Sequence, residues 1–289
     1  MSLRAVIEQA GQTAPARLDA VALWSAELGH SPISPEDRGG HHPLLIPFAR
    51  EPGGVLGLLR WATPPEDHPM PVVREDVHGL HLVAPSVDQL LHTELATRDA
   101  EGAPYDELLE AANAPETLYE PGMVALVGHG PNAYLILRVG AAPSFYEQLA
   151  LRHLSREDGA AALVTADRGC TAALGWGRPL AFRARLLADL GRMDEARDAA
   201  RLSLLEPTWT LGGPVEEVAL LAGWRPPITS RSWRVLADNE EKPVLDRAAH
   251  LMDAIHVEGG DWTAARPQLA SFYDEAGLHT LAAFVRLAP

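Results

Sequence analysis

Gly191–Ala196 reads GRMDEA and Gly260–Ala265 reads GDWTAA, and these two strings decide how the second half of the chain is interpreted. Each string runs from a glycine through a short polar stretch to an alanine. A glycine suits the end of a helix because it adopts the left-handed backbone conformation without strain. The alanine leaves room for a second helix to approach the first. Each string is therefore predicted to join the two helices of a hairpin.

The spacing of the two strings predicts a repeat. Gly260 lies 69 residues after Gly191, which is about two repeats of the length typical of stacked helical hairpins. A weaker joint at Leu154–Ala160 precedes the corresponding stretch at Leu190 by 36 residues. The chain is therefore expected to form four hairpins and a capping helix, at 145–167, 179–206, 214–240, 244–276 and 278–287.

The joint residues and their period resemble those of tetratricopeptide (TPR) repeat proteins, over about half of the chain. Ala196 and Ala265 match the small position in the second helix of that repeat. The first helix of each unit departs from the family because it lacks the early Trp and the Leu-Gly pair, so the array is described as TPR-like. The resemblance implies a superhelical stack whose concave face binds peptides or partner proteins and carries no catalytic residues.

The first half of the chain reads as a mixture of strands and helices. Apolar runs at 44–48 and 55–61 flank the turn Glu51–Gly54, which predicts a strand hairpin. Helices are expected over 14–28 and over 86–98, the second beginning with a capping box of Ser86 and Gln89. Further strands are expected at 71–74, at 79–84 and in a second hairpin formed by Met123–Val127 and Ala133–Val139 around Gly128–Asn132.

The predicted fold class is α+β. A mixed α+β domain is expected over residues 1–143, and an all-α TPR-like solenoid of about four helical hairpins over 144–289. Three further strings resemble a family found in bacteria and chloroplasts, a resemblance that supplies no function: Leu58–Trp61 (LLRW), Tyr119–Gly122 (YEPG) and Gly175–Pro179 (GWGRP).

Composition excludes several classes of protein. The 39 acidic and 24 basic residues give a net charge of −15, which disfavours nucleic acids and anionic membranes as partners. Cys170 is the only cysteine, so an intrachain disulfide and a multi-cysteine zinc site are excluded. No apolar run is long enough for a membrane span or a secretory leader. These features lead to the expectation of a cytoplasmic protein.

Arginines of the predicted repeats form the favoured binding site. The segment 178–206 carries six arginines and five acids, so its net charge is +1 while the rest of the chain carries −16. Helical spacing predicts that Asp194 pairs with Arg197 and Asp198 with Arg201. The arginines that remain are expected to hold an acidic segment or a C-terminal carboxylate: Arg178, Arg183, Arg185 and Arg192.

Tryptophans are also concentrated in the second half, which holds five of the seven. Most of them are expected to pack between hairpins. Trp209 lies in a linker and is the least committed to a helix face, so it is the tryptophan expected to anchor a bound peptide.

Histidines supply the alternative, an acid–base or metal site. Asp88 and His92 are four residues apart on a predicted helix and share a face, with Glu75, Asp76 or His81 as a second group. His81, Asp88 and His92 are thus the catalytic residues of this alternative. Ordinary surface pairs have the same spacing and no His-Glu-x-x-His string is present, so no metal is expected. Six of the 12 histidines fall in this region: His41, His42, His68, His78, His81 and His92.

Other chemistries lack support. Gly128–Ala133 looks like a glycine-rich phosphate loop, but a strand is expected after it where a dinucleotide site requires a helix. Cys170 is expected to be a buried apolar residue rather than a reactive thiol. No cofactor is therefore expected. The favoured function is a non-enzymatic interaction or assembly factor that binds an acidic or extended peptide, and the alternative is a small enzyme or metal-binding protein.

Overall fold

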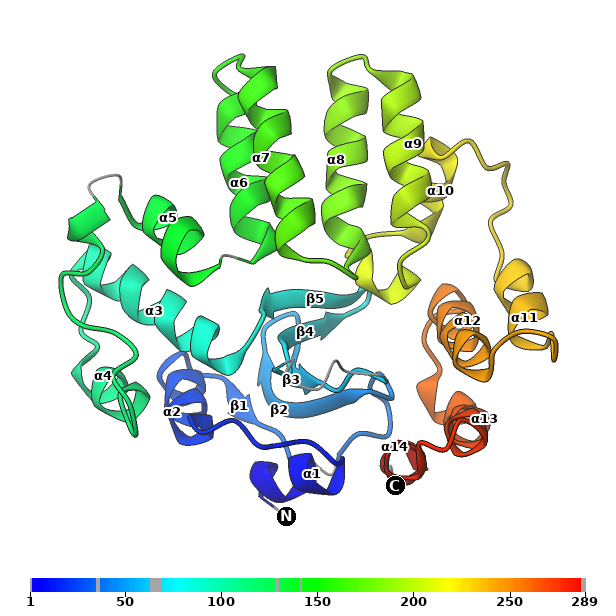
Figure 1. Ribbon diagram of the computed structural model, residues 1–289, viewed down its shortest axis with the longest axis horizontal. Coiled ribbons are helices and arrows are strands. Elements are labelled where there is room, and N and C mark those ends of the chain that lie inside the picture. The colour runs from blue at the N-terminus through cyan, green and yellow to red at the C-terminus, as the bar shows by residue number, and fades with distance from the viewer. Residues whose placement is uncertain (1, 35–36, 63–68, 128–129, 141, 287–289) are drawn as a thin grey trace.

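The computed structural model describes residues 2–34, 37–62, 69–127, 130–140 and 142–286 (Figure 1). Its fold class is α+β, as predicted: a five-stranded antiparallel sheet lies at the centre, and the second half of the chain is helical. In Figure 1 helices surround the sheet, with α1 and α2 below it, α3 to α5 on one side, α6 to α9 above it and α11 to α14 on the other side.

The sheet is a meander in which each strand pairs with the next along the chain. Every pair is antiparallel, and the β2–β3 pairing is the hairpin expected from the apolar runs. Leu45 to Ala49 of β2 are all buried, without the alternation of a sheet that has one wet face, because both faces of the sheet are covered. The strands are β1 (Ser31–Pro32), β2 (Leu45–Glu51), β3 (Gly54–Leu59), β4 (Val72–Asp76) and β5 (Gly79–Ala84).

The first helices along the chain are α1 (Leu3–Gln9), α2 (Leu18–Glu27), α3 (Val87–Glu101) and α4 (Asp106–Ala112). The capping prediction for α3 is confirmed, since the Ser86 side chain accepts a hydrogen bond from the backbone N–H of Gln89 at 3.1 Å. Gly102, with φ +67°, ends this helix in the left-handed conformation. The helix expected over 14–28 is α2, which begins at Leu18.

The prediction of a second strand hairpin is wrong. The segment is helical instead: η1 (Ala125–Val127) and α5 (Gly130–Tyr134) are followed by a π-helical turn, η2 (Leu135–Val139). Leu135 and Val139 are buried while Leu137 between them is exposed, which is the burial pattern of one helical face. A short apolar run does not distinguish a strand from a helix by periodicity, which explains the error. Residues 128–129 of the predicted turn lie outside the described residues.

The first two predicted helical hairpins are confirmed. They consist of α6 (Pro143–Leu154) with α7 (Gly159–Ala172), and α8 (Gly177–Asp189) with α9 (Met193–Ser203). Gly191 joins α8 to α9 with φ +75°, as its place in the string predicted. Ala196 and Ala200 are fully buried where the two helices cross. The small side chains allow the close approach inferred from the sequence.

The prediction of a third hairpin is wrong. Both of its helices form, but they pack on other helices and not on each other. α10 (Val215–Leu221) packs against α9, and α11 (Arg231–Ala237) packs against α12 (Val244–Val257). Pro226 and Pro227 interrupt the chain between α10 and α11, and the connection runs over a long distance (Figure 1). The fourth hairpin is confirmed as α12 with α13 (Trp262–Glu275), and the capping helix as α14 (His279–Arg286).

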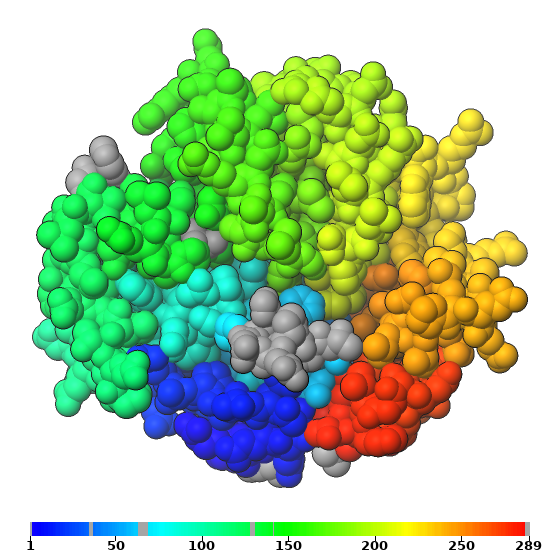
Figure 2. Space-filling model, in the orientation of Figure 1, coloured from blue at the N-terminus to red at the C-terminus, as the bar shows by residue number. Residues whose placement is uncertain are grey.

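One hydrophobic core joins the sheet to helices from both ends of the chain. Trp209, on the short helix η3 (Thr208–Thr210), is 2% exposed within this core. At the far end, Arg38 donates to the backbone oxygen of Phe284 at 2.9 Å, so the N-terminal part holds the end of α14. Figure 2 shows the C-terminal helix beside the N-terminal residues. Within the described ranges, every helix is too short or too polar to cross a membrane.

Candidate functional site

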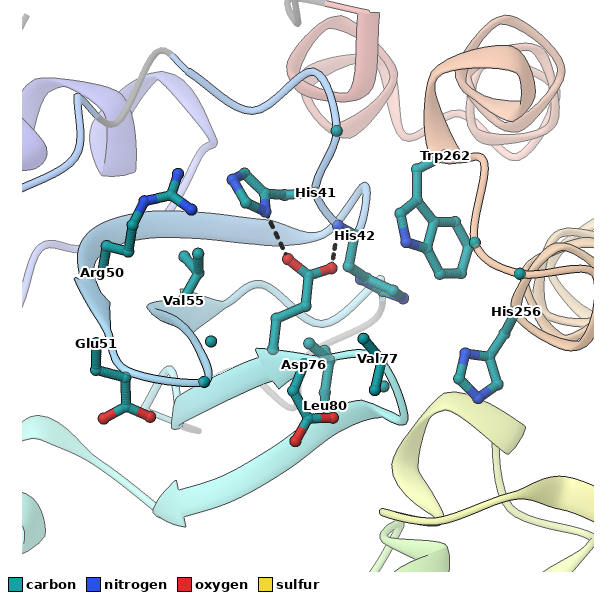
Figure 3. Close-up of a pocket in the computed structure, with 17 residues that line it drawn as sticks. His41, His42, Arg50, Glu51, Val55, Asp76, Val77, Leu80, His256 and Trp262 are labelled. Atoms are coloured by element: carbon teal, nitrogen blue, oxygen red, sulfur yellow. Dashed lines mark hydrogen bonds and ion pairs between the residues drawn. The ribbon is translucent and has the colours of Figure 1, made fainter.

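A cleft of about 470 Å³ lies between the sheet and the turn that joins α12 to α13 (Figure 3). The β2–β3 turn and the β4–β5 turn form one wall, and the loop at 40–42 closes one end. His256 and Trp262 face the cleft from the α12–α13 side. We call this feature the central cleft. Its walls come from parts of the sequence that are more than 200 residues apart.

Glu75 of the central cleft is held at both of its carboxylate oxygens. Its two oxygens accept hydrogen bonds from His41 Nδ1 and from the backbone N–H of His42, each at 2.7 Å. Glu75 lies on β4, opposite Val55 and Leu80 of the neighbouring strands, so the sheet fixes its position. The carboxylate therefore holds the 41–42 loop against β4.

His42 is buried and neutral. Its ring lies 4.5 Å from that of Trp209 and 4.7 Å from that of Trp262. Nδ1 accepts a hydrogen bond from the backbone N–H of Leu44 at 3.3 Å, so the ring proton is on Nε2. Burial lowers its pKa well below the usual value, and the neighbouring His256 and Arg266 lower it further. His42 thus packs the floor of the cleft and does not serve as a base at neutral pH.

Asp76 links the central cleft to the helical half. Its carboxylate lies 2.8 Å from His81 Nε2, and His81 Nδ1 accepts from Arg178 at 2.7 Å. Arg178 also donates two hydrogen bonds of 2.8 Å to Glu147 of α6. The pKa of His81 is lowered, chiefly by burial and also by the charge of Arg178, although Asp76 opposes this. The network fastens the β4–β5 hairpin to α6 and α8.

The three residues of the predicted acid–base site have separate partners. His81 belongs to the network just described. Asp88 forms an ion pair with Arg17 at 2.8 Å, and His92 Nε2 lies 2.7 Å from the hydroxyl of Tyr134. Asp88 and His92 both lie on α3, as predicted, but their side chains contact different residues and not each other. Over the described residues, no group of three or more His, Cys, Asp or Glu side chains is arranged to hold a metal ion.

The predicted arginines of α8 and α9 are found in several environments. The helical pairs are confirmed, since Arg197 lies 3.0 Å from Asp194 and Arg201 lies 3.2 Å from Asp198. Arg178 is occupied by Glu147 and His81. Among the other three candidates, Arg183 contacts Asp167, Arg192 donates to Glu195 at 2.7 and 2.6 Å, and the exposed Arg185 has its Nε 3.4 Å from the oxygen of Ala181.

Trp209 is not at the surface. The sequence favoured it as an exposed anchor, but it is 2% exposed and packs between His42 and Trp61. The physical reason is that η3 lies against β5, so the linker that carries Trp209 is covered by the sheet. It is a core residue in this conformation.

The remaining candidates from the sequence are a cysteine, a glycine-rich loop and a histidine. Cys170 is half-buried, and burial raises the pKa of its thiol to about 11, so the thiol stays protonated at neutral pH. The phosphate-loop candidate Gly128–Ala133 lies partly outside the described residues, and its last four residues begin α5. His68 also lies outside the described residues.

Sequence reasoning missed the central cleft. His41, Glu75 and Asp76 were noticed separately, but His256 and Trp262 were not connected to them. The doublet His41–His42 was a usable signal, because two adjacent histidines beside a strand are unusual. Nothing local linked this doublet to the α12–α13 turn, since that contact is made only by the folded chain.

Comparisons with known proteins match most of the chain. A PAB N-terminal domain matches residues 3–137, a PAB middle domain matches 143–225 and a PAB C-terminal domain matches 239–288. Protein IN CHLOROPLAST ATPASE BIOGENESIS, chloroplastic, from Arabidopsis thaliana is 37% identical over 273 residues, covering 89% of this chain and 82% of the relative. No solved structure matches.

These matches confirm the resemblance of three strings to a family found in chloroplasts, and they correct one expectation. The cytoplasmic location inferred from the sequence is contradicted by the relative, which is a chloroplastic protein. The inference used the single cysteine, which indicates only a reducing compartment. It also used the absence of an apolar leader, but chloroplast transit peptides are amphipathic rather than apolar.

Proposed function

This chain belongs to the PAB family, that of Protein IN CHLOROPLAST ATPASE BIOGENESIS, and from this premise we propose that it is a non-enzymatic assembly factor for an ATPase. The observation that carries the proposal is the 37% identity, over 82% of its length, to a relative whose name refers to chloroplast ATPase biogenesis. An assembly factor acts by binding its client, so the chain needs surfaces that recognise protein segments.

The exposed apolar residues of the helical half support a role in protein binding. Exposed apolar side chains that gather in one region are a feature of protein-binding surfaces. In the part of the chain that the structure describes, α9, α10, α11 and the residues next to them carry six such side chains, between 41% and 81% exposed: Met193, Leu202, Leu205, Leu220, Trp224 and Val235.

We further propose that the helical half, residues 144–289, is the client-binding part and that 1–143 form its support. Stacked hairpins of the TPR-like kind bind extended segments on one face. Arg183, Arg185 and Arg192 are the arginines proposed to hold an acidic client segment. Arg183 and Arg192 are paired with surface carboxylates, which a client carboxylate can replace at little cost. Arg178, held between Glu147 and His81, keeps α8 in place behind them.

The assembly role is tested by deleting the gene and measuring the assembled ATPase on native gels. We expect the assembled enzyme to fall several-fold while its individual subunits are still synthesised. Return of the wild-type chain should restore assembly. An unchanged amount of assembled ATPase in the deletion strain would contradict the proposal.

The arginine site is tested with a double charge reversal, Arg183→Glu with Arg185→Glu. Binding to the purified, unassembled ATPase subunits should weaken about tenfold or more, because attraction to an acidic segment becomes repulsion. The matched control is Arg4→Glu with Arg50→Glu, two exposed arginines outside the helical half that give the same charge change. Equal binding by the two double variants would rule out the arginine site without affecting the assembly role.

A further inference from the structure

The inner end of the central cleft holds a buried donor that lacks an acceptor. His42 is 1% exposed, and its Nε2 has no hydrogen-bond partner among the residues that the structure describes. The backbone N–H of Leu44 occupies Nδ1, so Nε2 carries the ring proton and can only donate. A buried donor that stays unpaired destabilises the fold, so a partner from outside the chain would be favourable here.

Figure 3 shows where this donor points. The ring of His42 reaches toward the space between Val77, His256 and Trp262, which all line the central cleft. The indoles of Trp209 and Trp262 flank the ring, and an indole nitrogen is a donor and not an acceptor. Their ring faces offer the N–H only a weak contact. We call this end of the cleft the His42 pocket, formed by His42, Val77, His256 and Trp262.

Two further side chains of the His42 pocket supply N–H donors. A Cβ at Gly260 would lie 3.4 Å from the indole nitrogen of Trp262, so the glycine leaves this N–H uncovered. In Figure 3 the indole nitrogen lies on the side of the ring that faces the 41–42 loop. Burial lowers the pKa of His256 to about 4, so the ring is neutral and one of its nitrogens donates. Neutral N–H groups from three side chains therefore converge on the pocket.

The charges that act on the His42 pocket are positive. Arg266 is 4% exposed and donates to the backbone oxygen of His41 at 2.9 Å, so its guanidinium lies against the loop that carries His42. Burial lowers the pKa of His42, and the charges of His256 and Arg266 lower it further. Burial likewise lowers the pKa of His256, with a smaller contribution from His78. None of these neighbours is a carboxylate, so the pocket favours a negative group.

The carboxylates of the central cleft are turned to other partners. Both oxygens of Glu75 accept hydrogen bonds from the 41–42 loop. Asp76 accepts from the backbone N–H of His78 at 2.8 Å, and Glu51 lies 3.6 Å from Arg74. A cation would therefore find few free acceptors in the cleft, whereas an anion meets donors that are free.

From this convergence of N–H donors beside a buried guanidinium, we propose that the His42 pocket binds an oxyanion, the carboxylate or phosphate of a small molecule. The N–H groups of His42, His256 and Trp262 donate to its oxygens. The volume of the central cleft, about 470 Å³, is typical of small-molecule sites, so the rest of the ligand has room to extend toward the β2–β3 turn. This inference depends neither on the assembly role nor on the arginine site of α8 and α9.

The probes are inorganic phosphate and acetate, each added to the full isotope-labelled chain with chloride keeping the ionic strength constant. NMR follows the indole N–H signals. The signal of Trp262, assigned by its loss in Trp262→Phe, should shift in a saturable way, and the probe that binds more tightly identifies the kind of oxyanion. The matched reference is Trp233, which is also 6% exposed but lies outside the cleft, and whose signal should stay in place. No saturable shift of the Trp262 signal with either probe would overturn the proposal.

The donors are tested with His256→Phe, which keeps an aromatic ring and removes its N–H. Binding should weaken about tenfold, the effect of losing one hydrogen bond to a charged group. The matched control is His250→Phe, on the same helix but outside the cleft lining, which should bind within about twofold of the wild type. The remaining indole signals show whether each variant is folded. Equal binding by the two variants would mean an adventitious ion only and would overturn the proposal.

The charge of the ligand is tested on the wild-type chain, so this arm does not depend on a variant that folds. Acetamide has nearly the shape of acetate but carries no charge. It should bind about tenfold more weakly or less, because hydrogen bonds to an ionised acceptor are roughly twice as strong as those to a neutral one. Equal affinity for acetate and acetamide would show that the pocket accepts any carbonyl group, and would overturn the assignment to an oxyanion.

Discussion

The two hairpin turns that border the central cleft look alike locally and differ in their surroundings. Gly53 in the β2–β3 turn has φ +111°, and Gly79 in the β4–β5 turn has φ +107°. A Cβ at Gly53 would meet nothing within 4 Å, whereas a Cβ at Gly79 would lie 2.4 Å from the backbone oxygen of Trp209. The β2–β3 turn is therefore free of neighbours at Gly53, whereas the β4–β5 turn is docked against η3 at Gly79. The same backbone requirement thus serves a simple turn in one place and a contact between the sheet and the helical half in the other.

The largest effect expected is that of Gly79→Ala. Both Gly79→Ala and Gly53→Ala force alanine into a backbone conformation that it rarely adopts, so the strain is common to the two variants. Only Gly79→Ala also collides with Trp209. Its free energy of unfolding should therefore fall by about 2–3 kcal/mol more than that of Gly53→Ala in urea titrations. Equal losses would show that the β4–β5 turn is not held against η3.

A smaller loss of stability is expected from Glu147→Gln, which weakens the network that fastens the β4–β5 hairpin to α6 and α8. Glu147 receives two hydrogen bonds from the half-buried Arg178, which then reaches His81. Loss of the carboxylate should cost about 2 kcal/mol of unfolding free energy. Glu195→Gln removes the same chemistry from the exposed Arg192 pair and should cost much less, because solvent screens that pair. Similar costs for both variants would mean that the network adds nothing to docking.

The smallest effect is a pH dependence in α12, beneath the docked turn. Burial lowers the pKa of His256 to about 4, with a smaller contribution from His78, and burial raises the pKa of Asp253 to about 7 although Thr208 donates to its carboxylate. The unfolded chain binds more protons at His256, so this residue adds stability above about pH 6.5 that is lost as the pH falls toward 4. Asp253 acts in the opposite sense, adding stability below about pH 4 that is lost as the pH rises toward 7.

Variants separate the two contributions. Between about pH 4 and 6.5 the two slopes oppose each other, each with a limit of about 1.4 kcal/mol per pH unit. Relative to the wild type, Asp253→Asn should make unfolding free energy rise more steeply with pH, and His256→Gln should make it rise less or fall. Urea titrations at several pH values measure the difference. Parallel curves for the wild type and Asp253→Asn would mean that Asp253 has an ordinary pKa in the folded chain.

The sequence predicted much of the fold where the signals were local. The β2–β3 hairpin, the capped helix α3 and the α8–α9 joint at Gly191 all follow from residues within a few positions of each other. The errors fall where a local pattern permits two structures. The apolar stretch 133–139 fits a strand or a helix, and the helices α10 and α11 were paired because they are neighbours in sequence, although each packs on a different neighbour.

The candidate site was less predictable than the fold. Asp194–Arg197 and Asp198–Arg201 could be paired from helical spacing alone, but Arg178, a member of the same predicted cluster, is held by Glu147 and His81. Trp209 shows the same limit, because an uncommitted position in a linker gave no sign that the sheet would cover it. The burial of a residue depends on which other elements pack over it, and the hydropathy of the residue itself does not predict this.

The sequence by itself determined the α+β class, the β2–β3 hairpin, the α8–α9 joint and the charge of each segment, because backbone preference and apolar periodicity are properties of short stretches. Tertiary structure alone decided that the 41–42 loop, β4 and the α12–α13 turn enclose a cleft, and that Leu126 and Leu137 stay exposed to water. The physical reason is that contacts between distant segments depend on how all the elements pack together. No single stretch contains that information.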